Sequence, residues 1–348
     1  MRAFREHLIL KGTLIKDALV VLNNLAKDAI AFVVDENDRL IGALTDGDVR
    51  RGLIKGVNID EPVEAIIQIN PKYLVKGEEN ILKVIEYRTA NFRILPVVDS
   101  EQKVVNVINF GDLKSYLPID AIIMAGGRGS RLSPLTDSTP KPLLKIGNES
   151  IIELNIKRLT SFGIDDFWIT LNYLGDQIQR HLGTGERQNI HIQYVTENIP
   201  MGTIGAVSQI NNLKHEHVLV TNSDILTNLD YEDFYLAFLK SGADMAVVTI
   251  PYKVDIPYAV LETSNGHILN LKEKPSYTYY SNGGIYLMKK SMLNNIPKNT
   301  FYNTTDLIED ILKSGNKVFS YPLNGYWLDI GKHEDYEKAQ KDIHNLKF

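Results

Sequence analysis

The chain has 348 residues, 23% of them charged, with a formal net charge of −5 and no cysteine. This length allows about two domains, and the lack of cysteine excludes disulfides, thiolate metal sites and cysteine catalysis. The near balance of 38 basic and 43 acidic residues argues against a general nucleic-acid binder, because such proteins neutralise phosphates. No apolar run reaches the ~20 residues of a membrane span, and the N-terminus lacks a signal-peptide pattern. We therefore expect a cytoplasmic protein without a membrane partner.

An internal repeat occupies the first part of the chain. The segment VVDENDRLIGALTDGDV (33–49) aligns with VVDSEQKVVNVINFGDL (97–113) at an offset of 64. Each copy is predicted to form a strand, a turn, a returning strand and the start of a helix. Asp48 and Asp112 are then expected near helix N-termini, where the helix dipole favours a carboxylate. Apolar residues at helical spacing also predict a helix before each hairpin, at Ile15, Leu19, Leu22 and Leu25 and at Ile81, Leu82 and Ile85.

Residues 1–117 resemble a tandem CBS pair (cystathionine-β-synthase-type domains), which has an α+β fold. The resemblance rests on GALTDGD (42–48), a small-x-x-Thr-x-x-Asp pattern that clamps a ribose in that family. It implies an adenine-nucleotide site in which Thr45 contacts phosphate or ribose and Asp48 the ribose hydroxyls. The second copy keeps Asp112 but has asparagine in place of the glycine and the threonine. The alternative is that both aspartates only cap helices and that the pair only dimerises.

The pattern changes after the segment 115–120, so we place a second domain at 118–348. Short apolar runs at 121–125, 167–171, 218–221 and 245–250 alternate with stretches that include an amphipathic segment at 151–159. Strands at this spacing predict an α/β fold with a Rossmann-like, doubly wound mixed sheet. Ligands of such sheets bind beyond the carboxyl ends of the strands.

A glycine-rich loop, AGGRGSRLSPLT (125–136), directly follows the first of these strands, and PKPL (140–143) comes soon after it. Glycines after a strand let backbone N–H groups approach phosphates closely. The spacing fits neither the dinucleotide-binding G-x-G-x-x-G nor a P-loop. It resembles the signature of the sugar-1-phosphate nucleotidylyltransferases. That resemblance implies nucleotide contacts from Met124, in the strand before the loop, and from Gly126, Gly127 and Gly129 of the loop.

In that family a sugar 1-phosphate attacks the α-phosphorus of a nucleoside triphosphate and pyrophosphate leaves. Arg131, with its planar fork of donors, suits the triphosphate and the departing pyrophosphate. Lys141 suits the phosphates at the reacting centre. Asp224 follows an apolar run, and Asp329 stands in a W-x-D-x-G pattern. The resemblance implies that these two carboxylates hold one Mg²⁺, a cation that prefers oxygen ligands.

Two further patterns concern the sugar and the base. The resemblance implies that Glu273 of E-K-P and Asn282 of N-x-G hold sugar hydroxyls, and that Lys274 reaches the sugar phosphate. Glu197 and Gly202 fall in a segment similar to the family's base loop. A carboxylate only accepts hydrogen bonds and so matches the adjacent N–H groups of guanine, which favours GTP. Glycine at 202 leaves no side chain to crowd the base.

The sequence thus predicts an enzyme that transfers a nucleoside monophosphate, with GTP favoured, to a sugar 1-phosphate. A CBS pair fused to a transferase resembles guanylyltransferases of surface-sugar pathways, which implies products of the GDP-glucosamine, GDP-mannose or GDP-heptose type; one such enzyme acts on glucosamine 1-phosphate on the way to legionaminic acid. The alternatives are a uridylyl- or thymidylyltransferase acting on glucose 1-phosphate, and a nucleotide-sensing protein with an inactive transferase fold. We also expect a homo-oligomer, because CBS pairs commonly associate.

Overall fold

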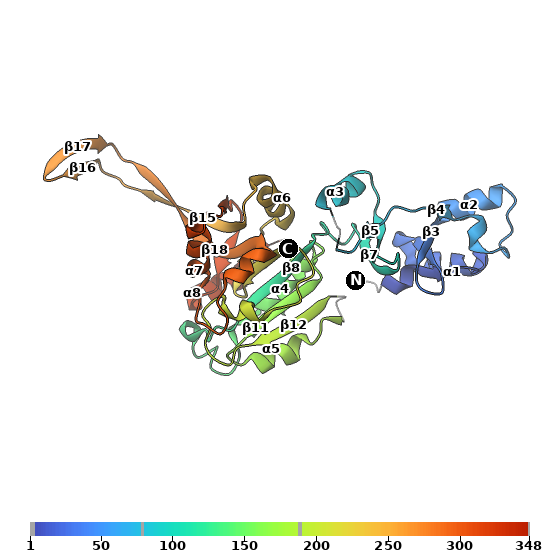
Figure 1. Cartoon of the computed structure of the whole chain (residues 1–348), viewed down its shortest axis with the longest axis horizontal. Coiled ribbons are helices and arrows are strands. Elements are labelled where there is room, and N and C mark those ends of the chain that lie inside the picture. Colours follow the sequence, from blue (N-terminus) through green and yellow to red (C-terminus); the bar gives the residue numbers. More distant parts are fainter. Residues whose placement is uncertain (1–3, 78–79, 187–189, 347–348) are drawn as a thin grey trace. The chain divides into compact units, whose positions relative to one another are not determined.

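The computed structural model describes residues 4–77, 80–186 and 190–346 (Figure 1). It divides into two compact units. The first unit comprises Met1–Ile119, Leu159–Asp166 and Thr184–His191, and the second comprises Asp120–Arg158, Phe167–Gly183 and Ile192–Phe348. The first unit therefore takes two short segments that lie beyond the predicted domain boundary. Among the described residues, no helix is both long enough and apolar enough to cross a membrane.

The first unit contains the two predicted copies. In the first copy, a four-stranded sheet in the order β1 (Leu8–Leu10), β2 (Ile30–Val34), β3 (Leu40–Thr45) and β4 (Gln68–Ile69) packs with α1 (Ile15–Leu25) and α2 (Asp46–Ile54). The second copy has a three-stranded sheet of β5 (Leu74–Val75), β6 (Ile94–Val98) and β7 (Val104–Asn109), together with α3 (Ile81–Thr89).

The repeat is reproduced in the geometry. Both hairpins begin and end at positions 64 apart, and both shift register at the same place, Val33/Val34 in one and Val97/Val98 in the other. Two backbone bonds join the copies: Leu40 N–H donates to Gln102 O at 3.0 Å, and Val104 N–H donates to Asp38 O at 2.9 Å. Because each bond is the other shifted by 64 residues, the copies are related by a pseudo-two-fold axis.

Two details of the repeat were predicted wrongly. Asp112 lies in a turn, where its N–H donates to Asn109 O at 3.0 Å, and the described residues between β7 and β8 form no helix. Pro118 cannot continue a helix, and the chain runs straight into the next strand. In α3 the buried face is formed by Ile81, Val84 and Tyr87, whereas Leu82 is 65% exposed.

The first unit also binds the segment Leu159–Asp166. Lys114 N–H donates to Ser161 O at 2.7 Å, and Leu117 N–H donates to Phe162 O at 3.0 Å. Gly163 has φ +76°, and a Cβ there would lie 2.5 Å from the Tyr116 Cα, so only glycine fits this approach. The segment is thus tied to the end of the repeat region by backbone bonds.

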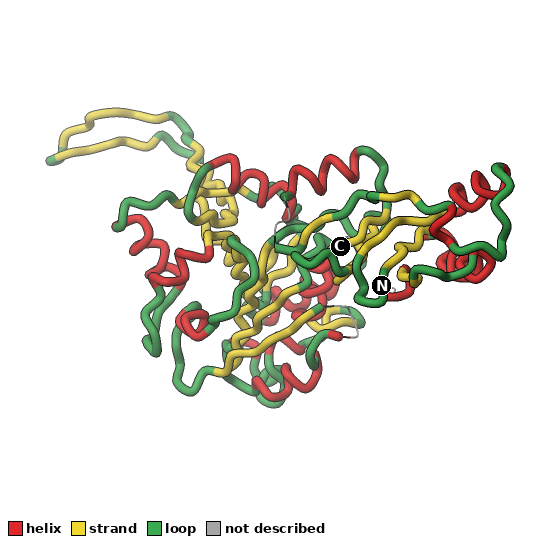
Figure 2. Tube along the Cα trace, turned by 45° about the vertical axis from the view of Figure 1, so that its right-hand side comes forward, coloured by secondary structure: helices red, strands yellow, loops and turns green. Residues whose placement is uncertain are grey.

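The second unit is built on a large mixed sheet, as the sequence predicts (Figure 2), and this sheet has seven strands. Its order is β12 (His191–Thr196), β11 (Asp166–Leu171), β8 (Ile119–Ala125), β13 (His217–Asn222), β18 (Ser276–Lys289), β15 (Met245–Asp255) and β19 (Val318–Pro322). β8 pairs parallel with β11, and β18 pairs antiparallel with β13 and β15, so the sheet is mixed. The helices of this unit are α4 (Ile151–Thr160), α5 (Gly175–Leu182), α6 (Tyr231–Ser241), α7 (Thr304–Lys313) and α8 (His333–Asp342).

Two short ladders flank the large sheet. One pairs β9 (Lys145–Ile146) with β10 (Glu149–Ser150), and the other pairs β14 (Ile225–Thr227) with β20 (Trp327–Asp329). Trp327 of β20 donates its indole N–H to Gly283 O of β18 at 2.9 Å. This bond fastens the predicted W-x-D-x-G segment to the centre of the unit.

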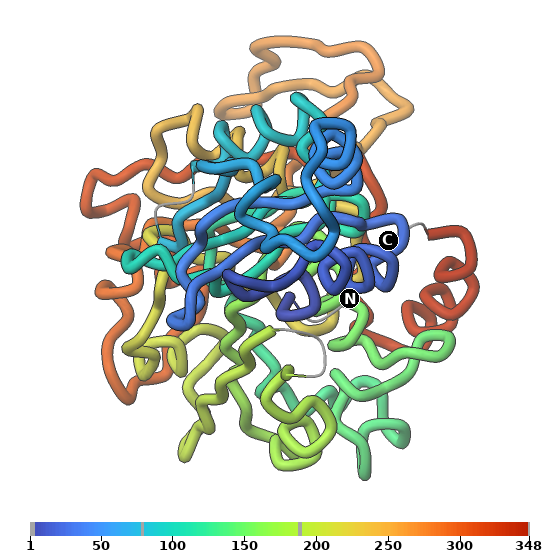
Figure 3. The backbone as a smooth tube through the Cα atoms, turned by 90° about the vertical axis from the view of Figure 1, so that its right-hand side faces the viewer, coloured from blue at the N-terminus to red at the C-terminus, as the bar shows by residue number. Residues whose placement is uncertain are grey.

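Residues 250–281 form a projecting β ribbon that we call the arm. β15 and β18 run on beyond the sheet as a two-stranded ladder from Ile250↔Ser281 to Asp255↔Ser276. Beyond it β16 (Val260–Ser264) and β17 (His267–Lys272) form a terminal hairpin. The arm extends away from the body of its unit, as the orange ribbon at the top of Figure 3 shows.

Candidate functional site

A cavity of about 700 Å³ opens in the second unit at the carboxyl ends of β8 and β13, where a doubly wound sheet binds its ligands. We call it the main pocket. Its volume lies within the range of small-molecule sites. Nine of the predicted site residues line it: Met124, Gly126, Gly127, Gly129, Arg131, Lys141, Glu197, Gly202 and Asp224.

The glycine-rich loop is braced by a hydrogen bond within its own segment and by contacts with Tyr173. Gly129 has φ +63°, and its carbonyl accepts a hydrogen bond of 2.9 Å from the Thr136 hydroxyl. The Tyr173 hydroxyl donates to the Thr136 carbonyl at 3.1 Å, and the Arg128 guanidinium lies 5.2 Å from the centre of the Tyr173 ring. A Cβ on Gly127 would meet no atom within 4 Å, so the backbone there faces open space.

One cation and two carboxylates meet beside this loop. Lys141 is buried and forms an ion pair with Asp224, while its ammonium lies 3.9 Å from Asp329. The two aspartates are neighbours because β14 and β20 pair Ile225 with Asp329. Ile330 N–H also donates to Asp224 O at 3.0 Å. The local ladder thus brings together two residues that are more than one hundred positions apart.

The electrostatics of this pair fit a cation. Burial and the nearby charge of Asp224 raise the pKa of the Asp329 carboxyl. One oxygen of each carboxylate, Asp224 Oδ1 and Asp329 Oδ1, is buried without a hydrogen-bond partner among the described residues. A buried, unpaired carboxylate oxygen is costly unless a cation or donor satisfies it. Two such oxygens side by side are suitable ligands for a hard divalent ion such as Mg²⁺.

The segment predicted to read the base is braced by residues that the sequence analysis did not single out for this role. Glu197 Oε2 accepts from Asn172 Nδ2 at 3.0 Å and from Met201 N–H at 3.2 Å. The other oxygen, Oε1, lies 3.2 Å from where a Cβ on Gly126 would stand. Glu197 therefore ties two walls of the main pocket together with one oxygen, which leaves Oε1 to meet a ligand.

Gly202 is required for a reason different from the one expected. It has φ +75°, and a Cβ there would lie 2.6 Å from the Tyr302 carbonyl oxygen. That carbonyl accepts from Ile204 N–H at 3.1 Å and from Gly205 N–H at 3.2 Å. The side chain is thus excluded by a protein backbone, whereas we had expected it to be excluded by the base.

Several lining residues were missed or left undecided by sequence reasoning. Asn172 and Tyr173 follow β11 and line the main pocket, and a strand end in a doubly wound sheet was a usable signal for them. Thr203 and Phe301 also line it. Phe301 has no local signal, because it reaches the pocket through the backbone bond of Tyr302 N–H to Met201 O, 3.0 Å long.

The predicted sugar residues are separated from the rest. Asn282 lies at the root of the arm, paired with Thr249, and its Oδ1 accepts from Gly284 N–H at 2.9 Å. Glu273 and Lys274 lie on the arm between β17 and β18, are exposed, and do not line the main pocket. The structure therefore does not bring them together with Arg131 and Lys141.

The predicted nucleotide clamp of the first CBS copy is occupied by its own hydrogen bonds. Thr45 caps α2, and its hydroxyl donates to Asp48 Oδ2 at 2.6 Å, while Arg51 donates to Asp48 Oδ1 at 2.6 Å. Burial opposes ionisation, but the bonds from Thr45 and Arg51 hold the pKa of Asp48 below its ordinary value. This is the helix-capping arrangement that was the alternative interpretation.

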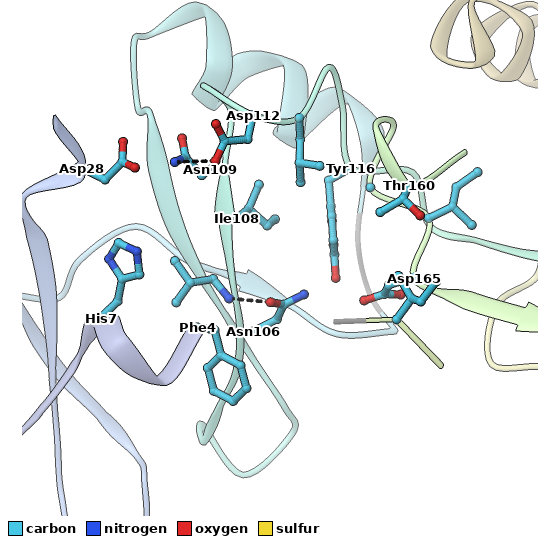
Figure 4. Close-up of a pocket in the computed structure, with 15 residues that line it drawn as sticks. Phe4, His7, Asp28, Asn106, Ile108, Asn109, Asp112, Tyr116, Thr160 and Asp165 are labelled. Carbon is cyan, nitrogen blue, oxygen red and sulfur yellow. Dashed lines mark hydrogen bonds between the residues drawn. The ribbon is translucent and has the colours of Figure 1, made fainter. Parts of the chain in front are cut away.

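A small cavity of the first unit lies instead at the second copy (Figure 4). It is lined by Asn109 and Asp112, joined by a hydrogen bond of 3.3 Å, and by His7 and Asp28 among others. Its volume of about 50 Å³ leaves room for roughly one or two water molecules. Of the three predicted CBS site residues, Asp112 lines this cavity, and Thr45 and Asp48 do not.

Comparison with known families assigns the second unit to a class of proteins. The family model described as nucleotidyl transferase matches residues 120–345, and the CBS domain model matches residues 8–55. The chain belongs to the nucleotidyl transferase family and carries a CBS domain.

Particular relatives are similar to the second unit. A mannose-1-phosphate guanylyltransferase catalytic subunit beta from Dictyostelium discoideum is 31% identical over 226 residues, or 62% of each chain. A D-glycero-alpha-D-manno-heptose 1-phosphate guanylyltransferase from Aneurinibacillus thermoaerophilus is 27% identical over 65% of this chain and 98% of its own. The crystal structure of HddC from Yersinia pseudotuberculosis has a TM-score of 0.50 and 26% identity, covering 65% of this chain and 99% of that one. The chain spans about 62% of the length of the first of these relatives.

Proposed function

We propose that this protein transfers a nucleoside monophosphate from a nucleoside triphosphate to a sugar 1-phosphate, with GTP as the preferred donor. The observation that carries the proposal is the meeting of Arg131, Lys141, Asp224 and Asp329 beside a glycine-rich loop at the carboxyl ends of β8 and β13. A pocket of this composition suits a reaction between two polyanions, where positioning and charge neutralisation dominate.

In the proposed reaction, an oxygen of the sugar 1-phosphate attacks the α-phosphorus. The bond from this phosphorus to the bridging oxygen breaks, and its electron pair leaves with pyrophosphate. Backbone N–H groups of the loop 126–129 hold the triphosphate, Arg131 binds the charge on the leaving group, and Lys141 lies at the reacting centre. Asp224 and Asp329 would hold Mg²⁺, which when bound supplies positive charge to the phosphate oxygens.

The preference for GTP is supported by Glu197 and by the relatives. Its Oε1 is an acceptor directed at the pocket, and guanine presents two adjacent N–H donors that a carboxylate can accept. The relatives from Dictyostelium discoideum and Aneurinibacillus thermoaerophilus are both named as guanylyltransferases. Uracil and thymine present one N–H between two carbonyls, so a uridylyl- or thymidylyltransferase is the second candidate.

The test is a matrix of four nucleoside triphosphates against a panel of sugar 1-phosphates that includes glucosamine, mannose, heptose and glucose, read by pyrophosphate release. We expect turnover with GTP, dependent on Mg²⁺ and lost on EDTA treatment. Asp224→Asn should abolish it, while Glu309→Gln, which changes an exposed carboxylate on α7, should leave it unchanged. Turnover with UTP or dTTP alone would show that GTP is not the preferred donor. No turnover with any pair of nucleoside triphosphate and sugar 1-phosphate would favour a nucleotide-sensing protein with an inactive transferase fold.

An adenine nucleotide at the CBS pair remains a prediction, with Thr45, Asp48 and Asp112 as its candidates. The closed contacts of Asp48 and the volume beside Asp112 mean that binding would require the copies to rearrange. A thermal shift with AMP, ADP or ATP that disappears in Asp48→Ala would support it. The cytoplasmic location also remains a prediction from the sequence.

A further inference from the structure

The arm carries an exposed apolar surface that a two-stranded ribbon cannot bury by itself. Among its large apolar side chains, those at least 48% exposed are Tyr252, Tyr258, Leu261, Ile268, Leu269, Leu271, Tyr279 and Tyr280. An isolated two-stranded hairpin is at best marginally stable in water. Monomeric proteins rarely expose apolar patches larger than a few hundred Å². The arm therefore has the composition of an element that packs against a partner.

The arm also carries two of the residues expected to bind the sugar 1-phosphate. Glu273 and Lys274 lie just beyond the last ladder pair, Asp255↔Ser276. Six residue steps separate this pair from Thr249↔Asn282 at the root of the arm, which corresponds to about 20 Å of strand. The root adjoins the main pocket, since a Cβ on Gly284 would lie 2.7 Å from Asn222 Nδ2, and Asn222 lines that pocket.

The ladder prevents Lys274 from folding back into the pocket of its own chain. β15 and β18 stay in register from Thr249↔Asn282 to Asp255↔Ser276, and both strands continue into the centre of the seven-stranded sheet. Reversing the arm would break the backbone hydrogen bonds of this ladder, and each broken bond would cost free energy. The ladder, which is about 20 Å long, instead directs the arm outward, towards another molecule.

The main pocket lacks what the arm offers. Its charged lining residues are Arg128, Arg131 and Lys141 against Glu197 and Asp224, and Lys141 is already paired with Asp224. Even with one Mg²⁺ held by Asp224 and Asp329, this lining carries less positive charge than a triphosphate and a sugar phosphate together carry negative charge. Beside the pocket, Ile199 and Phe301 are 53% and 61% exposed, which provides an apolar rim for an apolar arm.

We propose that two copies of this chain exchange arms, so that Glu273 and Lys274 of one copy complete the main pocket of the other. This proposal rests on the proposed function. Each chain has both an arm and a complementary pocket. Two copies related by a two-fold axis can therefore each place an arm at the other's pocket, which gives a closed dimer. In that dimer Lys274 supplies the cation for the sugar phosphate, and the apolar tip packs on the rim at Ile199 and Phe301.

The first test is a cross-link, because the chain has no cysteine and introduced thiols are unique. Lys274→Cys is placed in one tagged copy and Thr203→Cys, on the exposed edge of the pocket, in a differently tagged copy. A short bis-maleimide should link the two tags. Leu271→Asp on the arm should abolish the link, while the equally exposed Leu312→Asp on α7 should not. Absence of a link between the tags, or a link unaffected by Leu271→Asp, would overturn the proposal.

The second test is complementation. Lys274→Ala and Asp224→Asn are co-expressed with different tags, and the doubly tagged dimers are isolated. Each such dimer has one pocket that combines an intact body with an intact arm, so we expect about half of the wild-type turnover, although each parent is inactive. Turnover no higher than that of the parents would show that the arm acts within its own chain. If the wild type transfers no nucleotide at all, the proposed function fails, and the cross-link still decides whether arms are exchanged.

Discussion

Gly202 offers a sharp test of how the base loop is positioned. Its φ of +75° strains any other residue, and a Cβ would lie 2.6 Å from the Tyr302 carbonyl oxygen. The left-handed conformation costs a non-glycine residue about 1–2 kcal/mol, and forced repacking adds about 1–3 kcal/mol. We therefore expect Gly202→Ala to lower the free energy of unfolding by about 2–5 kcal/mol.

Two other glycines of the same unit separate these contributions. Gly242 has φ +62° and ψ +21°, which is the left-handed region, and a Cβ added there would meet nothing within 4 Å, so Gly242→Ala should cost only the conformational part, about 1–2 kcal/mol. Gly127 has open space and no positive φ, so Gly127→Ala should leave stability within about 0.5 kcal/mol. Urea unfolding followed by circular dichroism measures all three. Gly202→Ala should also raise KM for the nucleoside triphosphate, since it displaces the loop next to Glu197.

The reasoning would be refuted if Gly202→Ala and Gly242→Ala had the same stability. That result would mean that the Tyr302 carbonyl moves away without cost, and that the close approach is not what holds the loop. A loss of nucleotide affinity in Gly202→Ala without a loss of stability would restore our original explanation, in which the base excludes the side chain.

Three further changes test individual contacts. Asp48→Ala should lower the free energy of unfolding by about 1–2 kcal/mol at pH 7 through loss of the α2 cap. Because folding lowers the pKa of Asp48, this contribution is present above the ordinary carboxyl pKa and is lost as the pH falls through the lowered value. A difference in urea midpoints that does not change with pH would contradict the assignment. Lys141→Met removes the cation beside the partly exposed carboxylates of Asp224 and Asp329 and should destabilise the protein by about 1–3 kcal/mol. Part of this loss should be recovered in millimolar Mg²⁺, and no response of the melting temperature to Mg²⁺ would argue against the metal site. Trp327→Phe removes the bond to Gly283 O and should cost about 1 kcal/mol; calorimetry showing no change would mean that β20 is held by other contacts.

The parts of the fold that follow from local signals could be predicted. Residue spacing located the two hairpins of the repeat, since alternation and turn residues depend on nearby positions. The strand before the glycine-rich loop, and the glycines and basic residues that follow it, could likewise be predicted from neighbouring residues. Asp224 and Asp329 were predicted as a pair from family resemblance, and the β14–β20 ladder gives the physical reason that they meet.

The remaining features depend on partners that are far away in the chain. The requirement for glycine at 202 comes from the Tyr302 backbone, one hundred residues later, and no pattern around Gly202 reveals it. The helix expected at Asp112 does not form, because the chain enters β8 at Ile119 only a few residues later. No local pattern indicates that E-K-P lies on a ribbon, because alternating polar and apolar residues predict strands without telling how far they extend beyond a sheet.

The backbone bonds of Ser161 and Phe162 have a practical consequence for anyone who wishes to study the catalytic half alone. A shortened chain beginning at Asp120 would still contain residues 159–166, but it would lack Lys114 and Leu117, which donate to them. Two carbonyls would lose their donors, and Phe162, now buried, would lose the Lys114 ammonium 5.3 Å from its ring. Such a fragment should aggregate when expressed. The segment 159–166 lies within the range that the nucleotidyl transferase model matches, yet its backbone partners come from residues before that range.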